Sequence, residues 1–189
     1  MLNPEAERFQ DVVRSAEVET LRLTDDGTFP NNEALPVLLY RGALDLPRST
    51  PATVERLLEA NSWGGTWRDG IYRYHHYHST AHEVLAVADG SAQVQLGGDH
   101  GEIVDVQTGD VLMLPAGVAH KDFGSSPDFL VVGAYPEGQQ WDMNYGKPEE
   151  RPQADRNIER VALPETDPIY GVDGPLMEHW GSPDADPIG

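Results

Sequence analysis

Short apolar runs separated by glycine and proline dominate the middle of the chain. Between positions 66 and 135 this pattern predicts strands at 66–78, 82–88, 91–96, 102–106, 110–114, 118–123 and 128–135. The run AQVQL, at 92–96, alternates apolar and polar residues, which is typical of a strand with one dry and one wet face. Evenly spaced short strands with turn signals between them indicate a sandwich or barrel. A jelly roll is one of the usual ways for such a fold to protect its sheet edges.

The N-terminal third predicts two further strands and a helix. Residues 18–23 alternate apolar and polar positions, and residues 36–40 (PVLLY) are typical of a buried strand. Pro51 suits the first turn of a helix over 51–61, whose apolar residues fall on one face. The spacing of apolar residues also predicts a short helix over 4–16, with a frayed terminal segment as the alternative.

The segment 137–189 predicts a long C-terminal arm. It is rich in proline and in acidic residues, so a solvated, disordered tail is one interpretation. Large apolar residues recur from Trp141 to Trp180, however, and they are too numerous for a solvated tail. We therefore expect an extended arm that packs on the barrel or on a second subunit, with both tryptophans shielded from water.

Length and composition are those of a globular protein with one domain over 1–189. We expect N-terminal strands and a helix in 1–62, the barrel core in 63–136 and the arm in 137–189. The chain has no cysteine, which excludes disulfides, thiolate metal sites, iron–sulfur clusters and a cysteine nucleophile. Any metal must therefore be held by histidine, aspartate or glutamate.

The charge balance argues against two classes of partner. A net charge of −19 repels phosphate backbones and anionic lipid headgroups, so we expect neither nucleic-acid nor membrane partners. No apolar stretch is long enough to span a membrane, and the first residues lack the features of a signal peptide. These observations predict a cytoplasmic protein.

A cluster of histidines is the strongest chemical signal in the chain. Side chains at i and i+2 share a face of a strand, so His76 and His78 point the same way. Glu83 follows a short turn, from which the next strand can return its carboxylate to the same place, and His120 is the natural fourth ligand. Three imidazoles and one carboxylate make a good site for a divalent transition metal. A His-x-His pair alone is a weak signal, because neutral core or surface histidines are commoner than metal ligands.

Three other residues are candidates for lining a pocket near this cluster. Tyr72 and Tyr74 share the predicted face of His76, where they line a cavity or belong to the core. Asp122 shares its parity with His120, so it either enters the pocket or lies at a solvated strand end.

Two histidines of the cluster are not expected to be ligands. Strand parity turns His75 away from His76 and His82 away from Glu83. We therefore expect a supporting or surface role for His75 and His82.

The spacing of the cluster resembles the first motif of the cupin superfamily. That motif is glycine, five residues, His-x-His, four residues, glutamate, six residues and glycine. Gly70, His76, His78, Glu83 and Gly90 fit every gap.

A second stretch resembles the second cupin motif. Gly109 is followed after five residues by Pro-Ala-Gly at 115–117, and then after two residues by His120. Gly124 stands where the motif usually has asparagine, which is a turn residue rather than a ligand. The resemblance covers residues 70–124.

The resemblance implies an all-β double-stranded β-helix, the RmlC-like jelly roll. It also implies one metal inside the barrel, on His76, His78, Glu83 and His120; Fe, Mn, Ni, Zn and Cu are all candidates. The runs 132–136 and 164–168 are similar to those of small bacterial cupins of unassigned activity.

Two classes of function are compatible with these features. The first is a metal-dependent enzyme acting on a small molecule inside the barrel, as an oxygenase, isomerase or decarboxylase. The alternative is a non-catalytic module that binds or senses a small molecule, because a fold does not fix a function. We also expect a homodimer, since jelly-roll sheets have edges to cover and two-fold pairing is the commonest association.

Overall fold

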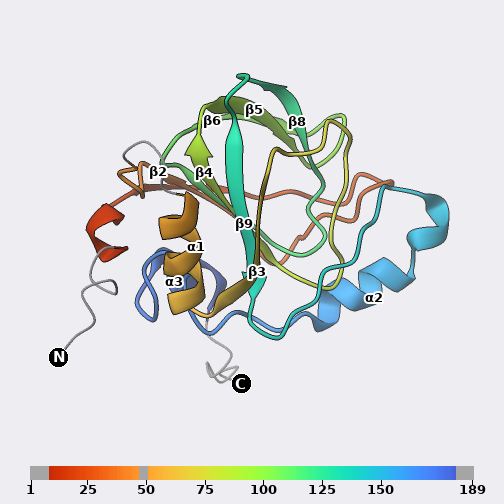
Figure 1. Ribbon diagram of the computed structural model, residues 1–189. Coiled ribbons are helices and arrows are strands. Elements are labelled where there is room, and N and C mark those ends of the chain that lie inside the picture. Colours follow the sequence, from red (N-terminus) through yellow and green to blue (C-terminus); the bar gives the residue numbers. More distant parts are fainter. Residues whose placement is uncertain (1–8, 47–50, 182–189) are drawn as a thin grey trace.

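The computed structural model describes residues 9–46 and 51–181, and its strands form two antiparallel sheets that face each other (Figure 1). The larger sheet has the strand order β1-β2-β7-β4-β9-β3, and the smaller has the order β6-β5-β8. The predicted all-β jelly roll is confirmed. The strands are β1 (Glu17–Leu21), β2 (Val37–Arg41), β3 (Trp63–Asp69), β4 (Glu83–Asp89), β5 (Ser91–Leu96), β6 (Glu102–Gln107), β7 (Val111–Leu114), β8 (His120–Ser125) and β9 (Leu130–Pro136).

Helices are few and short. They are η1 (Gln10–Val12), α1 (Pro51–Ala60), η2 (Pro148–Glu150), α2 (Gln153–Arg160) and α3 (Pro175–Trp180). The helix expected at 51–61 is therefore confirmed. The helix expected over 4–16 is wrong where it can be compared: residues 9–16 hold a single 3₁₀ turn, and residues 1–8 lie outside the described part of the chain. No described helix is long and apolar enough to cross a membrane.

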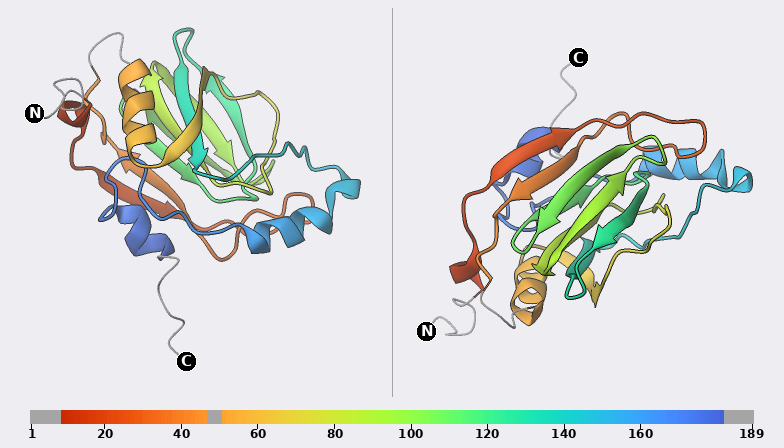
Figure 2. Two further views of the ribbon diagram at one scale, coloured as in Figure 1. Left: turned by 60° about the horizontal axis from the view of Figure 1, so that its bottom comes forward. Right: turned by 90° about the horizontal axis from the view of Figure 1, so that it is seen from above.

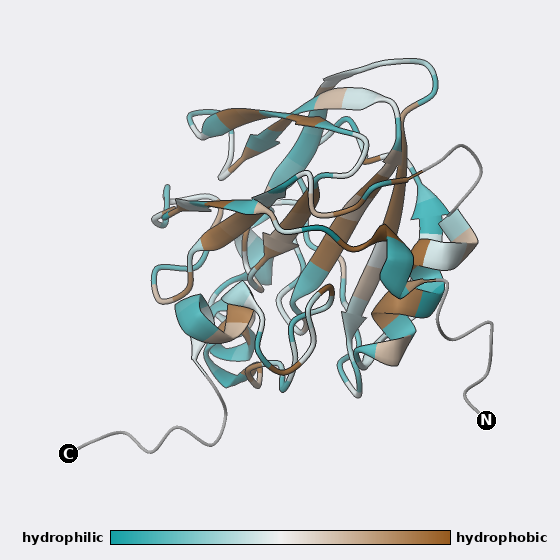
Figure 3. Ribbon diagram, turned by 90° about the vertical axis from the view of Figure 1, so that its left-hand side faces the viewer, coloured by the Kyte–Doolittle hydropathy of each residue, from teal (hydrophilic) through white to brown (hydrophobic). Residues whose placement is uncertain are grey.

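The central strands of the larger sheet are buried on both faces, as alternate residues of β4 show. Val84 and Ala86 belong to a core that includes residues of α1 and α3, whereas Leu85 and Val87 belong to a second core shared with the smaller sheet. Figure 2 shows α1 and α3 on the outer side of the larger sheet, and Figure 3 shows hydrophobic colour along its strands. Burial on both faces explains why β2 and β7 are continuous apolar runs rather than alternating ones.

Strand pairing places both cupin-like motifs at one end of the barrel. Glu83, the first residue of β4, pairs with Leu114, the last residue of β7. The chain then crosses from the larger sheet to the smaller one through residues 115–119 and begins β8 at His120. The two motifs therefore meet at the end of the barrel where β4 and β8 begin and β7 ends.

The predicted strand 66–78 is wrong in its second half, because β3 covers only the first part of that range. The chain leaves the edge of the larger sheet after β3 and crosses the open end of the barrel. There His76 forms an isolated bridge with His120, and Tyr77 forms one with Asn144. A segment that pairs with two different partners, one residue each, cannot continue a strand ladder.

The described part of the C-terminal arm, residues 137–181, packs on its own barrel and contains two α-helices, so this part is less extended than predicted. The indole nitrogen of Trp180 donates a hydrogen bond to the carbonyl of Pro36 at 2.8 Å, and the hydroxyl of Tyr40 donates one to Asp167 at 2.6 Å. Trp180 is buried as expected. The expectation for Trp141 is wrong, because that side chain is 51% exposed.

Candidate metal centre

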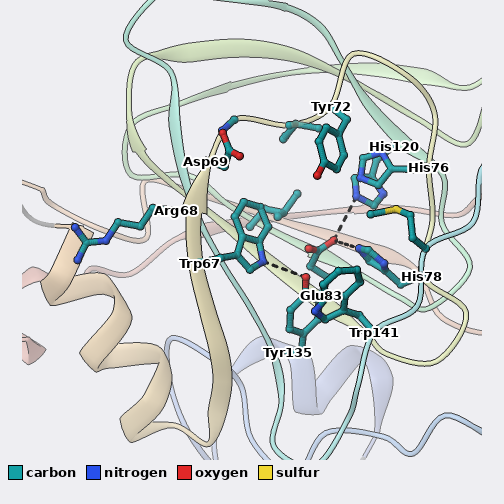
Figure 4. A pocket seen from close by; sticks show the side chains of 14 residues that line it. Trp67, Arg68, Asp69, Tyr72, His76, His78, Glu83, His120, Tyr135 and Trp141 are labelled. Carbon is teal, nitrogen blue, oxygen red and sulfur yellow. Dashed lines mark hydrogen bonds and ion pairs between the residues drawn. The ribbon is translucent and has the colours of Figure 1, made fainter.

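The side chains of His76, His78 and His120 converge at the open end of the barrel (Figure 4). One ring nitrogen from each lies within 4.8 Å of the others, and all three residues are buried. His76 and His78 come from the crossing loop after β3, and His120 begins β8. A buried group of three imidazoles could hold a metal ion.

Hydrogen bonds to main-chain carbonyls fix the tautomer of each imidazole. A carbonyl oxygen only accepts, so each Nδ1 must carry the proton and each Nε2 keeps a free lone pair. Partners of this kind also orient the ring of a metal-ligating histidine. The contacts from Nδ1 are His76 to the carbonyl of Tyr74 (3.1 Å), His78 to that of Asp142 (2.5 Å) and His120 to that of Val118 (2.9 Å).

The carboxylate of Glu83 completes the group. Its Oε2 lies 3.3 Å from Nε2 of His78 and 3.3 Å from Nε2 of His120, deep in the protein. Within the described part of the chain, no hydrogen bond of good geometry reaches this oxygen. Lone pairs of nitrogen and a carboxylate charge thus face one small volume, where a cation or an added proton must relieve their repulsion. The residues therefore fit a divalent transition metal.

The same burial and charges shift the pKa values of these groups. Burial, helped by the neighbouring His120, lowers the pKa of His76 to about 3. Burial lowers the pKa of His78 as well, but Glu83 outweighs it and the net pKa is raised. For Glu83, burial raises the pKa, and the attraction of His78 and His120 outweighs it, so the net pKa is lowered. The carboxylate therefore stays charged beside the imidazoles.

A glycine turn ties the two motifs together. The amide of Gly117 donates a hydrogen bond to the carbonyl of His78 at 2.7 Å, while the chain turns toward His120. Gly117 has a φ of +97°, and a Cβ there would lie 2.3 Å from the carbonyl oxygen of Asn31. Only glycine fits this position without displacing the backbone that carries the ligands.

A cavity of about 220 Å³ opens beside the three histidines and Glu83. Its walls are mostly aromatic and aliphatic, with two charged residues at the edge. In Figure 4 the guanidinium of Arg68 points away from the cavity, and it pairs with Glu55 at 2.7 Å. The other lining residues are Trp67, Asp69, Gly70, Ile71, Tyr72, Leu85, Tyr135, Trp141 and Met143.

The three residues that were predicted to line the pocket do not share one location in the structure. Tyr72 lines the cavity. Tyr74 and Asp122 are not among the residues that line it. Tyr74 stacks on Tyr72 with ring centroids 5.0 Å apart and stays exposed, because the chain has already left the strand on which the parity argument relied. Asp122 is buried, and its carboxylate accepts a hydrogen bond from the hydroxyl of Ser125 at 2.6 Å. It lies immediately before the register shift between β5 and β8.

His75 and His82 lie outside the group of three, as strand parity predicts. Nε2 of His75 is 3.1 Å from Oδ1 of Asp99. Nδ1 of His82 accepts a hydrogen bond from the amide of Ala116 at 2.9 Å.

Two walls of the cavity come from the arm and were missed by the sequence reasoning. Trp141 and Met143 flank the metal-binding group although they follow the barrel strands. The density of large apolar residues in the arm signalled packing, but no periodicity told which residues face a cavity.

A further wall of the cavity, the indole of Trp67, occupies space that is free because residue 133 is glycine. The indole nitrogen of Trp67 donates a hydrogen bond to the hydroxyl of Tyr135 at 3.0 Å. A Cβ on Gly133 would lie 2.1 Å from this indole, so glycine leaves the room that the indole occupies. Burial, together with the charge of Glu83, raises the pKa of Tyr135. The phenol therefore stays neutral beside the carboxylate of Glu83.

Comparisons with known proteins agree with this architecture. Residues 68–139 match the family model described as Cupin. The "Uncharacterized protein YjlB" of Bacillus subtilis (strain 168) is 43% identical over 164 residues, which are 87% of this chain and 97% of that protein. The chain is a cupin. The predicted membership of the superfamily is thereby confirmed, and the relative's name assigns no activity to this cupin.

Some solved structures resemble parts of this cupin at low sequence identity and low TM-score. An uncharacterized conserved protein with a double-stranded beta-helix domain from Klebsiella pneumoniae is 14% identical, covers 74% of this cupin and 94% of its own chain, and has a TM-score of 0.35. The 11S allergen of Cocos nucifera is 20% identical over 50% of this cupin, with a TM-score of 0.36, and the match spans 31% of its own chain. Likenesses at these TM-scores carry no argument about activity.

Proposed function

We propose that this cupin is a metal-dependent enzyme acting on a small molecule. One divalent transition metal is held by His76, His78, Glu83 and His120, and the substrate occupies the adjacent cavity. The observation that carries this proposal is the shared tautomer of the three histidines. Each Nδ1 is tied to a main-chain carbonyl, so three Nε2 lone pairs meet a buried carboxylate.

The donor set suits Fe, Mn, Ni, Zn or Cu. Held by these four residues, such a metal would supply Lewis-acid or redox chemistry to a small molecule in the cavity. Oxygenation, isomerisation and decarboxylation all lie within this proposal.

The cavity walls bind and shield the substrate. Trp67, Tyr72 and Trp141 offer aromatic surface to an apolar or planar part of a small molecule. Tyr135 holds its hydroxyl at the metal-binding end of the cavity, where it accepts the indole hydrogen bond of Trp67. The neutral phenol can orient a polar group of the substrate there.

Metal analysis of the purified protein tests the proposal. We expect one metal per chain in the wild type and a large loss in His76→Ala and His120→Ala. His100→Ala is the matched control, because His100 is an exposed histidine outside the site, and this variant should retain its metal. Full occupancy in both ligand variants would overturn the assignment.

Turnover is tested separately. The metal-loaded protein is incubated with panels of small carboxylic and hydroxy acids and phenols, while O₂ uptake and product formation are followed. We expect turnover that is lost in the ligand variants. If the metal-bound protein binds such compounds tightly but converts none of them, the enzyme proposal is wrong and a non-catalytic binding module is the better interpretation.

A further inference from the structure

The C-terminal arm returns to the metal centre at one short segment, residues 139–145, which we name the strap. Its main chain pairs with the loop that carries the first two histidines. The amide of Tyr77 donates to the carbonyl of Asn144 at 2.9 Å, and the amide of Asn144 donates to the carbonyl of Tyr77 at 3.0 Å. Next to this pair, Nδ1 of His78 donates to the carbonyl of Asp142 at 2.5 Å.

The orientation of His78 thus depends on a distant part of the chain. His76 and His120 bond to carbonyls only two residues earlier in their own segments. The carbonyl that holds His78 is 64 residues away. Local backbone geometry therefore suffices for two of the imidazoles, whereas the third needs the docked strap.

The carboxylate of Asp142 fixes the strap at this point. Oδ1 accepts a hydrogen bond from the amide of Ser79 at 2.6 Å. Oδ2 accepts one from the hydroxyl of Ser79 and another from Nδ2 of Asn144 at 3.0 Å. Ser79 is fully buried, and its hydroxyl accepts a further bond from Asn157 of α2 at 3.0 Å. Hydrogen bonds to a charged acceptor are stronger than those to a neutral one. The bonds from Ser79 to the carboxylate of Asp142 therefore hold the main-chain carbonyl of Asp142 next to His78.

We propose that Asp142 is a positioning residue for the metal centre. Its carboxylate clamps the strap to Ser79, and its carbonyl then holds His78 with Nε2 turned toward the metal position. This inference rests on the proposed metal site. It also predicts that metal binding and docking of the strap stabilise each other by the same free energy, because coupling between two equilibria is reciprocal.

The strap also forms part of the cavity wall. Trp141 and Met143, on either side of Asp142, line the cavity. The ring of Trp141 lies 5.7 Å from that of His78 and 6.2 Å from that of Tyr135, between centroids. Loss of the Asp142 clamp therefore loosens one metal ligand and one cavity wall together.

The first test needs no metal. Exchange of the Nδ1 proton of each histidine is followed by NMR in the metal-free wild type, in Asp142→Ala and in Glu149→Ala. The last is a matched control that removes an exposed acid from the same arm. We expect faster exchange at His78 alone in Asp142→Ala and no change in the control. Unchanged exchange at His78, or equal acceleration at all three histidines, would overturn the proposal.

The second test uses Co²⁺ as the probe metal. We expect Asp142→Ala to bind Co²⁺ about 10–100-fold more weakly than the wild type, as for other partners that orient metal ligands. Asp142→Asn keeps an acceptor for the Ser79 amide and should recover part of this loss. Affinity equal to that of the wild type in Asp142→Ala would refute the positioning role.

The two tests separate this inference from the proposed function. A wild type that binds no Co²⁺ or other divalent metal contradicts the metal site, while the exchange measurement still decides whether Asp142 positions His78. If Asp142→Ala fails to fold, as judged by circular dichroism, Asp142→Asn replaces it in both measurements. Its His78 proton should then exchange faster and its Co²⁺ affinity should fall; wild-type values for both would overturn the proposal.

Discussion

Asp167 anchors the C-terminal arm to the barrel, and its replacement tests whether the arm belongs to the folded core. The residue is completely buried, and its carboxylate accepts four hydrogen bonds. Oδ2 accepts from the hydroxyl of Tyr40 at 2.6 Å and from the amide of Leu176 at 3.1 Å. Oδ1 accepts from the amides of Ile169 and Tyr170 at 2.8 and 3.0 Å. The residue therefore joins β2 to the turn and helix that close the arm.

The size of the effect follows from these partners. In Asp167→Asn one carboxylate oxygen becomes an NH₂ group, and the amide of Leu176 is left facing a donor. A buried donor without a partner costs about 1–3 kcal/mol, and the remaining bonds lose their charge assistance, so we expect a loss of about 2–4 kcal/mol in the free energy of unfolding. Tyr40→Phe removes a single bond to the charged acceptor and should cost about 1.5–3 kcal/mol.

Urea denaturation followed by tryptophan fluorescence and circular dichroism measures these losses. The double variant should lose less than the sum of the two single variants, because both changes remove the same contact. Asp173→Asn, at an exposed position of the same arm, is the control and should stay within about 0.5 kcal/mol of the wild type. An Asp167→Asn variant as stable as this control would refute the anchoring role.

Three further predictions concern the cavity wall, the arm and the assembly. Gly133→Ala should lower the free energy of unfolding by about 1–3 kcal/mol because its Cβ collides with an indole, whereas Gly124→Ala, with open space around it, should cost nothing; urea midpoints check both. The pKa values of Asp25 and Asp155 are lowered, chiefly by hydrogen bonds from Arg151, so these pairs stabilise the fold above pH 3.8 and lose that effect as the pH falls further. Arg151→Gln should therefore reduce stability by about 1 kcal/mol or less at pH 7 and by nothing at strongly acid pH, as urea unfolding at the two pH values would show. Light scattering should give twice the 20.8 kDa chain mass, with an interface of apolar residues from the first 60 positions that tightens with salt; a monomer mass at both low and high salt would exclude the dimer.

The convergence of the candidate metal ligands could be predicted from the sequence because their spacing is local. His76 and His78 are two residues apart, and Glu83 follows within one turn and the start of a strand. Alternation of side chains brings such residues together even though the segment around His76 turned out to be a pair of bridges rather than a strand. His120 needed the second motif, since only strand pairing across the barrel brings it close.

The arm could be predicted only in outline. Its apolar residues indicated packing, and the burial of Trp180 agrees with that. The opposite outcome for Trp141 has a physical reason, because a residue at the rim of a cavity is apolar without being covered. The contact between Asp142 and His78 leaves no trace in any local pattern, since a main-chain carbonyl forms it across 64 positions.

Along the strap, residues that line the cavity alternate with a residue that holds the strap in place, so the cavity can be changed separately. Trp141 and Met143 line the cavity, while the main-chain carbonyl of Asp142, between them, accepts the hydrogen bond of His78. Changing the two outer side chains can thus alter which molecules fit, without touching the group that holds the histidine in place. A library randomised at these two positions would vary the cavity walls while keeping the hydrogen bonds of Asp142.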